Sequence, residues 1–143
     1  MVGLKTHNRK PFGLVVTGEA ETWREVVEQI VGADMLTTYP VTGDRELLNV
    51  VESGRVDAAV LDDDAGWVHD VLQLLRMIRR FDTALPVVVV TTRRERRYLE
   101  NALRLAAFSV VSKPLELEEL LRQIQRMMDR LEATLRADYE GRP

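Results

Sequence analysis

Residues 57–67, "DAAVLDDDAGW", decide how the rest of the chain is organised. A short apolar run, Ala58 to Leu61, ends in three consecutive carboxylates at positions 62, 63 and 64. A strand that is almost entirely apolar must be covered on both faces, as the strands of a parallel sheet are. Three like charges repel one another and cannot be buried unpaired, so either solvent or a nearby cation must accommodate them.

The same pattern continues on both sides of this run. From Phe12 onward, short apolar runs alternate with segments of helical period, which predicts a parallel sheet wrapped by helices. The predicted strands are 14–16, 35–41, 58–61, 87–90 and 108–111. Pro40 cannot donate to a strand ladder from a central position, so the second strand should lie at an edge. We therefore predict an α/β fold, a (βα)5 doubly wound parallel five-stranded sheet with strand order 2-1-3-4-5.

The segments between the strands carry apolar residues at helical spacing. These residues fall within 23–31, 47–51, 68–78 and 99–106, and a fifth helix should follow Pro114. Thr92 and Glu95 stand three apart, which predicts a capping box at the start of the fourth helix.

Length and composition indicate one globular domain. The chain has 143 residues, a formal net charge of -3 and no cysteine. These values predict no disulfide, no Cys-based metal site and no general attraction to nucleic acid or to a membrane. No apolar run approaches the length of a membrane span, and the opening residues lack the apolar centre of a signal peptide, so we expect a cytoplasmic protein. The expected division is a tail at 1–11, a domain at 12–128 and an extension of the last helix at 129–143.

Three polar residues are expected to meet at one rim of the sheet. Asp62 ends the third strand, Thr91 ends the fourth, and Lys113 follows the fifth. Ligands of open parallel sheets bind at the carboxyl ends of the strands, close to the point where the strand order reverses. An acid, a hydroxyl and an ammonium group therefore converge there from three separate parts of the sequence, and we predict an ion pair between Asp62 and Lys113.

These residues and their spacing resemble the receiver domain of two-component response regulators, the CheY-like domains with a flavodoxin-like fold. The resemblance rests on "DAAVLD" at 57–62, "LPVVVVTT" at 85–92 and "VVSKP" at 110–114, and it extends from about Phe12 to about Met128. It implies phosphorelay signal transduction, with Asp62 phosphorylated by a histidine kinase or a phosphotransfer protein. Thr91 would hydrogen-bond the phosphoryl group, and Lys113 would pair with its oxygens.

The metal-binding positions depart from this family. The family places two acids at the end of the first strand to hold Mg²⁺, whereas this chain has Thr17 and Gly18 there. Mg²⁺ prefers carboxylate oxygens, so the remaining candidate ligands are Asp62, Asp64 and Glu19, and Glu19 lies one residue too far along. The aromatic switch residue of the fifth strand is replaced by Val110. We therefore expect weak or absent phosphorylation.

Two other functions compete with a phosphorylated receiver. One is a phosphorylation-independent pseudo-receiver that acts as a dimerisation or docking module. The other, from a different class, is a flavodoxin-like cofactor binder, which is disfavoured because "TGEAETW" at 17–23 is not a phosphate-binding loop. Receiver domains change partners and do not turn over small molecules, so we expect no enzyme and assign no catalytic residue.

The surface suggests partners of two kinds. The run "RRERR" at 93–97 favours an acidic downstream protein over direct nucleic-acid contact, since no helix-turn-helix signature follows it. The last helix has apolar residues at alternating steps of four and three, the spacing of a coiled-coil seam. Its distal members, Met128, Leu131 and Leu135, lie at or beyond the expected end of the domain. We therefore predict a homodimer through them, with a helix leading to another domain as the alternative.

Overall fold

A computed structural model describes residues 10–140 of the chain. Its sheet is parallel throughout and has the predicted order, β2-β1-β3-β4-β5. The strands are β1 (Phe12–Val16), β2 (Leu36–Pro40), β3 (Ala58–Asp62), β4 (Val87–Thr91) and β5 (Ser109–Ser112). The flavodoxin-like fold is therefore confirmed. Residues 1–9 of the predicted tail and 141–143 of the predicted extension lie outside the described part of the chain.

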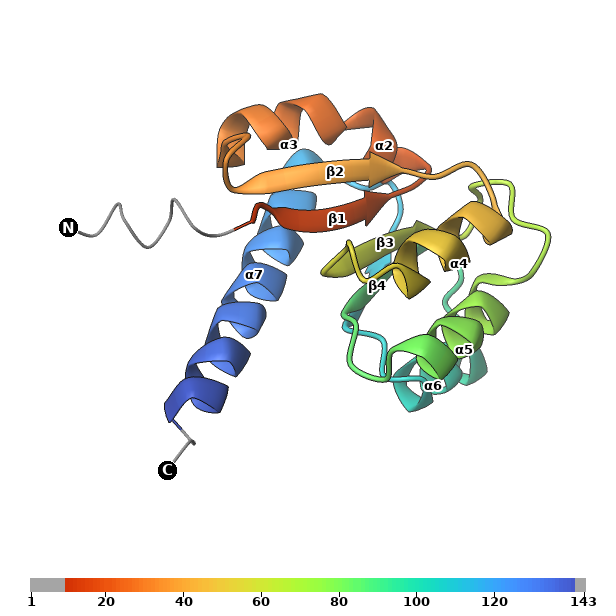
Figure 1. The fold of residues 1–143 in the computed structure, drawn as a ribbon. Coiled ribbons are helices and arrows are strands. Elements are labelled where there is room, and N and C mark those ends of the chain that lie inside the picture. Colours follow the sequence, from red (N-terminus) through yellow and green to blue (C-terminus); the bar gives the residue numbers. More distant parts are fainter. Residues whose placement is uncertain (1–9, 141–143) are drawn as a thin grey trace.

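Helices cover both faces of the sheet, as Figure 1 shows. They are α2 (Glu19–Thr22), α3 (Arg24–Val31), α4 (Asp44–Glu52), α5 (Val71–Phe81), α6 (Arg96–Arg104) and α7 (Leu117–Glu140). One apolar core lies between the sheet and α2, α3 and α7, and the other lies between the sheet and α4 and α5. β1, β3 and β4 are buried along their whole length, which explains their nearly continuous apolar sequence.

A glutamate of α3 forms hydrogen bonds to the edge strand β2. The Glu28 carboxylate accepts hydrogen bonds from both the amide (2.7 Å) and the hydroxyl (2.6 Å) of Thr38. Burial alone would raise the pKa of Glu28, but these hydrogen bonds and the Arg24 charge outweigh burial, so the net pKa is lowered. This contact ties the polar edge strand to α3.

Two helices begin later than the sequence predicts. α5 starts at Val71 because Asp70 caps it, together with Gln73 in a capping box, so Val68 lies before the helix and is 89% exposed. α6 starts at Arg96, with Glu95 at the N-cap position and no side-chain cap. The predicted Thr92–Glu95 capping box is therefore wrong. The Glu95 carboxylate instead accepts from the amide of Arg94.

The last helix is longer than the sheet it covers (Figure 1). Its most buried apolar side chains are Leu120, Ile124 and Met127, which all precede the predicted distal seam of Met128, Leu131 and Leu135. The seam residues Met128 and Leu131 are partly buried and pack against this same core. Leu135 is 50% exposed. Among the described helices, none combines the length and apolar character needed to cross a membrane.

Candidate functional site

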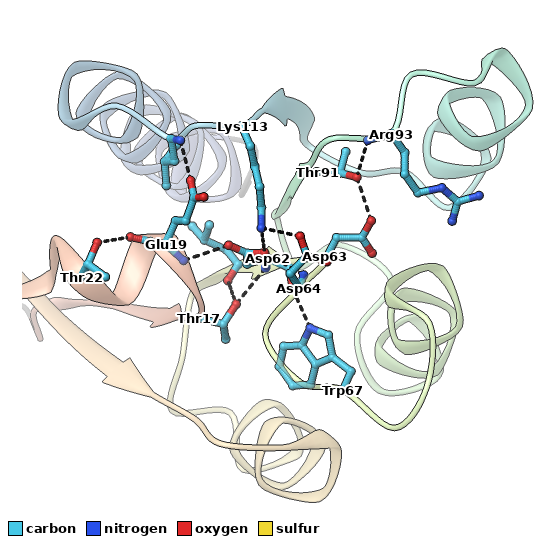
Figure 2. A network of polar contacts seen from close by, with 12 residues as sticks. Thr17, Glu19, Thr22, Asp62, Asp63, Asp64, Trp67, Thr91, Arg93 and Lys113 are labelled. Atoms are coloured by element: carbon cyan, nitrogen blue, oxygen red, sulfur yellow. Dashed lines mark hydrogen bonds and ion pairs between the residues drawn. The ribbon is translucent and has the colours of Figure 1, made fainter.

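The three predicted residues do meet at the carboxyl rim of the sheet. Asp62 is the last residue of β3, Thr91 is the last residue of β4, and Lys113 directly follows β5. β4 pairs with both β3 and β5, so the three positions lie side by side. Figure 2 shows their side chains together with those of Asp63 and Asp64.

Asp62 is buried, and both of its carboxylate oxygens are already bound by the chain. Oδ1 accepts from the Lys113 ammonium (2.6 Å) and from the amide of Asp64 (2.8 Å). Oδ2 accepts from the amide of Glu19 (2.8 Å). The residue is 1% exposed, so the predicted ion pair with Lys113 is confirmed and lies out of bulk solvent. A buried carboxylate requires such pairing, because leaving it unpaired costs several kcal/mol.

Lys113 gathers a second carboxylate, that of Asp64, at 2.9 Å. Burial by itself would lower the pKa of Lys113, but the hydrogen bonds and charges of Asp62 and Asp64 outweigh burial, and the net pKa is raised. The ammonium group therefore stays charged between two acids.

Thr91 binds Asp63, a contact that the sequence did not predict. Its hydroxyl donates to Asp63 Oδ2 (2.8 Å) and accepts from the amide of Arg93 (3.0 Å). The Asp63 amide in turn donates to the carbonyl of Val90 (2.9 Å). The consecutive acids were the available signal for this contact, but their order does not reveal which of them faces Thr91.

At the end of β1, Thr17 acts as a structural link. Its buried hydroxyl donates to the carbonyl of Val60 (2.9 Å) and accepts from the amide of Asp62 (2.9 Å). Gly18 follows with a φ of 55°, and a Cβ added to it would lie 2.4 Å from the Asp62 side chain. The Asp62 carboxylate therefore occupies the space that a side chain at position 18 would need.

Glu19, a predicted metal ligand, binds the loop after β5 instead. Its carboxylate accepts from the amide of Leu115 (2.6 Å), and the indole of Trp23 donates to the carbonyl of the same residue (3.1 Å). Both peptide groups flanking this position are thereby held against α2 and the start of α3. The Glu19 carboxylate has a structural partner, and only its backbone amide reaches Asp62.

These residues do not fit a bound Mg²⁺. Every oxygen of Asp62 faces a protein donor, Asp64 is paired with Lys113, and Glu19 is engaged by Leu115. Within residues 10–140, no group of three or more His, Cys, Asp or Glu side chains could hold a metal ion. A hard divalent cation needs several free oxygen ligands, whereas the oxygens of this site already accept hydrogen bonds from N–H groups of the chain.

An aromatic residue does adjoin Thr91, but it comes from α6. Val110, at the predicted switch position, is half-buried and packs against the core shared with α4 and α5. Tyr98 is 3% exposed, and the guanidinium of Arg93 stacks 4.1 Å from its ring centroid. Burial and the nearby Asp63 charge raise the pKa of Tyr98 to about 12, although the Thr91 hydroxyl acts in the opposite direction. Among the described residues, the buried Tyr98 hydroxyl has no hydrogen-bond partner with normal geometry.

Solved structures share this fold over most of their length. A receiver domain protein (CheY-like) from Methanospirillum hungatei is 16% identical with a TM-score of 0.73, covering 87% of this chain and 99% of its own. The signal receiver domain of a putative Luxo repressor protein from Vibrio parahaemolyticus is 19% identical with a TM-score of 0.73, covering 94% and 100%. The non-phosphorylated HemR receiver domain from Leptospira biflexa is 23% identical with a TM-score of 0.67, covering 82% and 94%.

The sequence itself gives the family. A comparison with curated proteins finds no match. The family model of the response regulator receiver domain matches residues 14–125, which include the whole rim described above. On this match, and with the predicted strand order in place, the chain belongs to the response regulator receiver domain family.

Proposed function

We propose that this two-component receiver domain holds Thr91 and Lys113 in place without phosphate. We propose also that Asp62 is phosphorylated weakly or not at all. One observation carries the proposal: each group that would contact a phosphoryl group is already bound by a carboxylate of the 62–64 run. Lys113 binds Asp62 and Asp64, and Thr91 binds Asp63. The three acids therefore replace, within the chain, the negative oxygens that a phosphoryl group would bring.

The state of Asp62 supports the same conclusion. A carboxylate attacks phosphorus through a free lone pair, and an incoming phosphoryl group needs its charge neutralised. Here the carboxylate is buried and hydrogen-bonded at both oxygens, and its neutralising lysine is shared with Asp64. Phosphorylation would have to break these contacts without the metal that the family normally uses.

The family's usual input partner is a histidine kinase or a phosphotransfer protein. On this proposal such a partner docks on the domain but transfers phosphate to Asp62 poorly. The domain then signals through which protein it binds, as a cytoplasmic docking module with residues 12–128 as its folded unit. Mg²⁺ would bind weakly, and we assign the chain no turnover of small molecules.

A homodimer through α7 is a second element of the proposal. Met128, Leu131 and Leu135 line a groove of about 310 Å³ together with Phe12 and Met35. Met128 and Leu131 are only partly covered by the core and Leu135 is 50% exposed, and apolar surface left uncovered in this way favours burial against a second copy. A groove shared by the helix and the start of β1 offers that copy a larger contact than the helix alone would.

The proposal can be tested with beryllofluoride, a stable mimic of the phosphoryl group. We expect that Mg²⁺ and beryllofluoride leave the NMR amide signals of Thr91 and Lys113 unchanged, because both side chains keep their carboxylate partners. Asp62→Asn, which removes the acceptor, is the matched control. Large shifts at both residues that disappear in Asp62→Asn would overturn the proposal.

A further inference from the structure

A groove lies beside the rim, between α5 and α6. The groove has a volume of about 400 Å³ and lies next to the loop that follows Thr91. Eight of its nine lining residues have a polar or charged side chain: Asp70, Leu72, Gln73, Arg76, Arg93, Glu95, Arg97, Tyr98 and Asn101 line it. None of these residues contributes to the contacts of Asp62 or Lys113 described above.

The groove holds positive charge that no side chain of residues 10–140 neutralises. Arg93 is shared between Glu95 at 3.1 Å and Asp70 at 3.7 Å. The side chains of Arg76 and Arg97 form no ion pair or hydrogen bond with any other residue that the structure describes. The whole chain carries a net charge of -3, so these exposed cations are a local feature of this surface.

We propose that this groove binds an acidic segment of a partner protein. Arg76 on α5 and Arg97 on α6 stand on its two walls, so carboxylates of one segment can reach both. Guanidinium groups bind carboxylates through paired hydrogen bonds, and Gln73 and Asn101 offer donors and acceptors to the backbone of that segment. The groove thus matches a peptide with spaced negative charges.

Nucleic acid fits the groove less well. Its only aromatic residue, Tyr98, is buried beneath Arg93 and cannot stack on a base. Asp70 and Glu95 would repel a continuous line of phosphates, whereas a peptide can place neutral residues opposite them. The acidic peptide is therefore the occupant that the charges favour.

The groove is connected to the rim through Arg93. The amide of Arg93 donates to the Thr91 hydroxyl, while its guanidinium lies over Tyr98 in the groove. A ligand carboxylate that draws this guanidinium away must disturb the residue whose backbone holds Thr91. Binding in the groove would therefore be felt at Thr91 whether or not Asp62 accepts phosphate, so this inference does not depend on the proposed function.

Titration of the full chain with a synthetic peptide of alternating Glu and Ser tests the inference. We expect NMR amide shifts at Gln73, Asn101 and Arg93, and no binding of the matched peptide of alternating Gln and Ser. Arg76→Gln/Arg97→Gln should weaken binding roughly fivefold, the combined effect of two exposed ion pairs. The matched control, Arg80→Gln/Arg104→Gln, removes the same charge from the same two helices outside the groove lining and should change affinity less than about twofold.

Several results would overturn the inference. These are absence of binding by the Glu peptide, equal binding by both peptides, shifts confined to other surfaces, and equal weakening by both double variants. Tighter binding of a short DNA duplex that is lost in Arg76→Gln/Arg97→Gln would also overturn it, in favour of a nucleic-acid surface. The exchanged arginines are exposed, and the amide spectrum of each variant reports directly whether it is folded.

Discussion

All three acids of the 62–64 run have side-chain partners within the chain, which accounts for three adjacent negative charges at the end of a buried strand. Asp62 and Asp64 share the Lys113 ammonium, and Asp63 accepts from Thr91. The charges are thus divided between one cation and one hydroxyl. This division gives the buried Asp62 carboxylate a cationic partner from within the chain.

We predict that Lys113→Met destabilises the domain by about 3–5 kcal/mol, because it leaves the Asp62 carboxylate buried and uncompensated. The double variant Asp62→Asn/Lys113→Met should recover part of this loss, since it removes both charges. Urea unfolding of the wild type and the two variants measures the effect. If the single and double variants are equally unstable, the ion pair does not hold Asp62 in place.

Tyr98→Phe should stabilise the domain at neutral pH by about 1 kcal/mol, because it removes a buried hydroxyl that has no hydrogen-bond partner among the described residues. The variant should also resist alkali better. The folded-state pKa of Tyr98, about 12, is raised above the ordinary value of 10.0, so the unfolded chain loses this proton first as the pH rises. The stability that depends on the protonated Tyr98 is therefore fully present below pH 10. It is then lost as the pH rises towards 12. Unfolding free energies at pH 7 and pH 11 test both statements, and a loss of stability at pH 7 would mean that the hydroxyl is satisfied.

At the scale of the elements, the turn after β1 explains why the rim lacks the acid pair of a metal-binding receiver. Gly18 has a left-handed φ and lies against Asp62, while Glu19 turns its carboxylate to the loop after β5. Position 18 therefore has no room for an acid, and position 19 has another role. An acid pair could be restored only by moving Asp62.

Gly18→Ala should consequently cost much more than Gly54→Ala. Both glycines have positive φ, 55° and 74°, but a Cβ at position 54 would meet no atom of residues 10–140 within 4 Å. We expect about 1–2 kcal/mol at Gly54, the cost of a left-handed backbone alone, and clearly more at Gly18 because of the clash. Thermal unfolding of the two variants provides the comparison. Equal costs would show that Asp62 can move aside easily.

Over the whole molecule, the sequence predicted the strand order, the edge position of β2 and the Asp62–Lys113 pair. These follow from hydrophobic periodicity and from the meeting of parallel strand ends at one rim, which depend little on local detail. The contacts of Asp63 and Glu19 could not be predicted, because the direction of a side chain after a strand depends on the backbone angles of the turn. The late start of α6 has the same origin, since Thr91 holds the Arg93 amide in the preceding loop.

We expect the chain to form a dimer through α7. Sedimentation at micromolar concentration should give twice the mass of the chain, and Leu131→Asp/Leu135→Asp should give the monomer mass. Leu103→Asp is the matched control, since it places the same charge at an exposed leucine on α6. Burying each methylene in the dimer contact contributes roughly 0.8 kcal/mol, and a charge at the contact would remove this contribution. A wild-type monomer, or a dimer that survives the α7 double variant, would remove this role of the helix.

The central claim is that Thr91 and Lys113 are held by carboxylates of the chain and that Asp62 is phosphorylated weakly or not at all. Intact mass measurement after incubation with Mg²⁺ and a small phosphodonor tests it. We predict little or no gain of one phosphoryl group, because Asp62 is buried, bound at both oxygens and without a fitting metal site. Rapid stoichiometric labelling that Asp62→Asn abolishes would contradict the account.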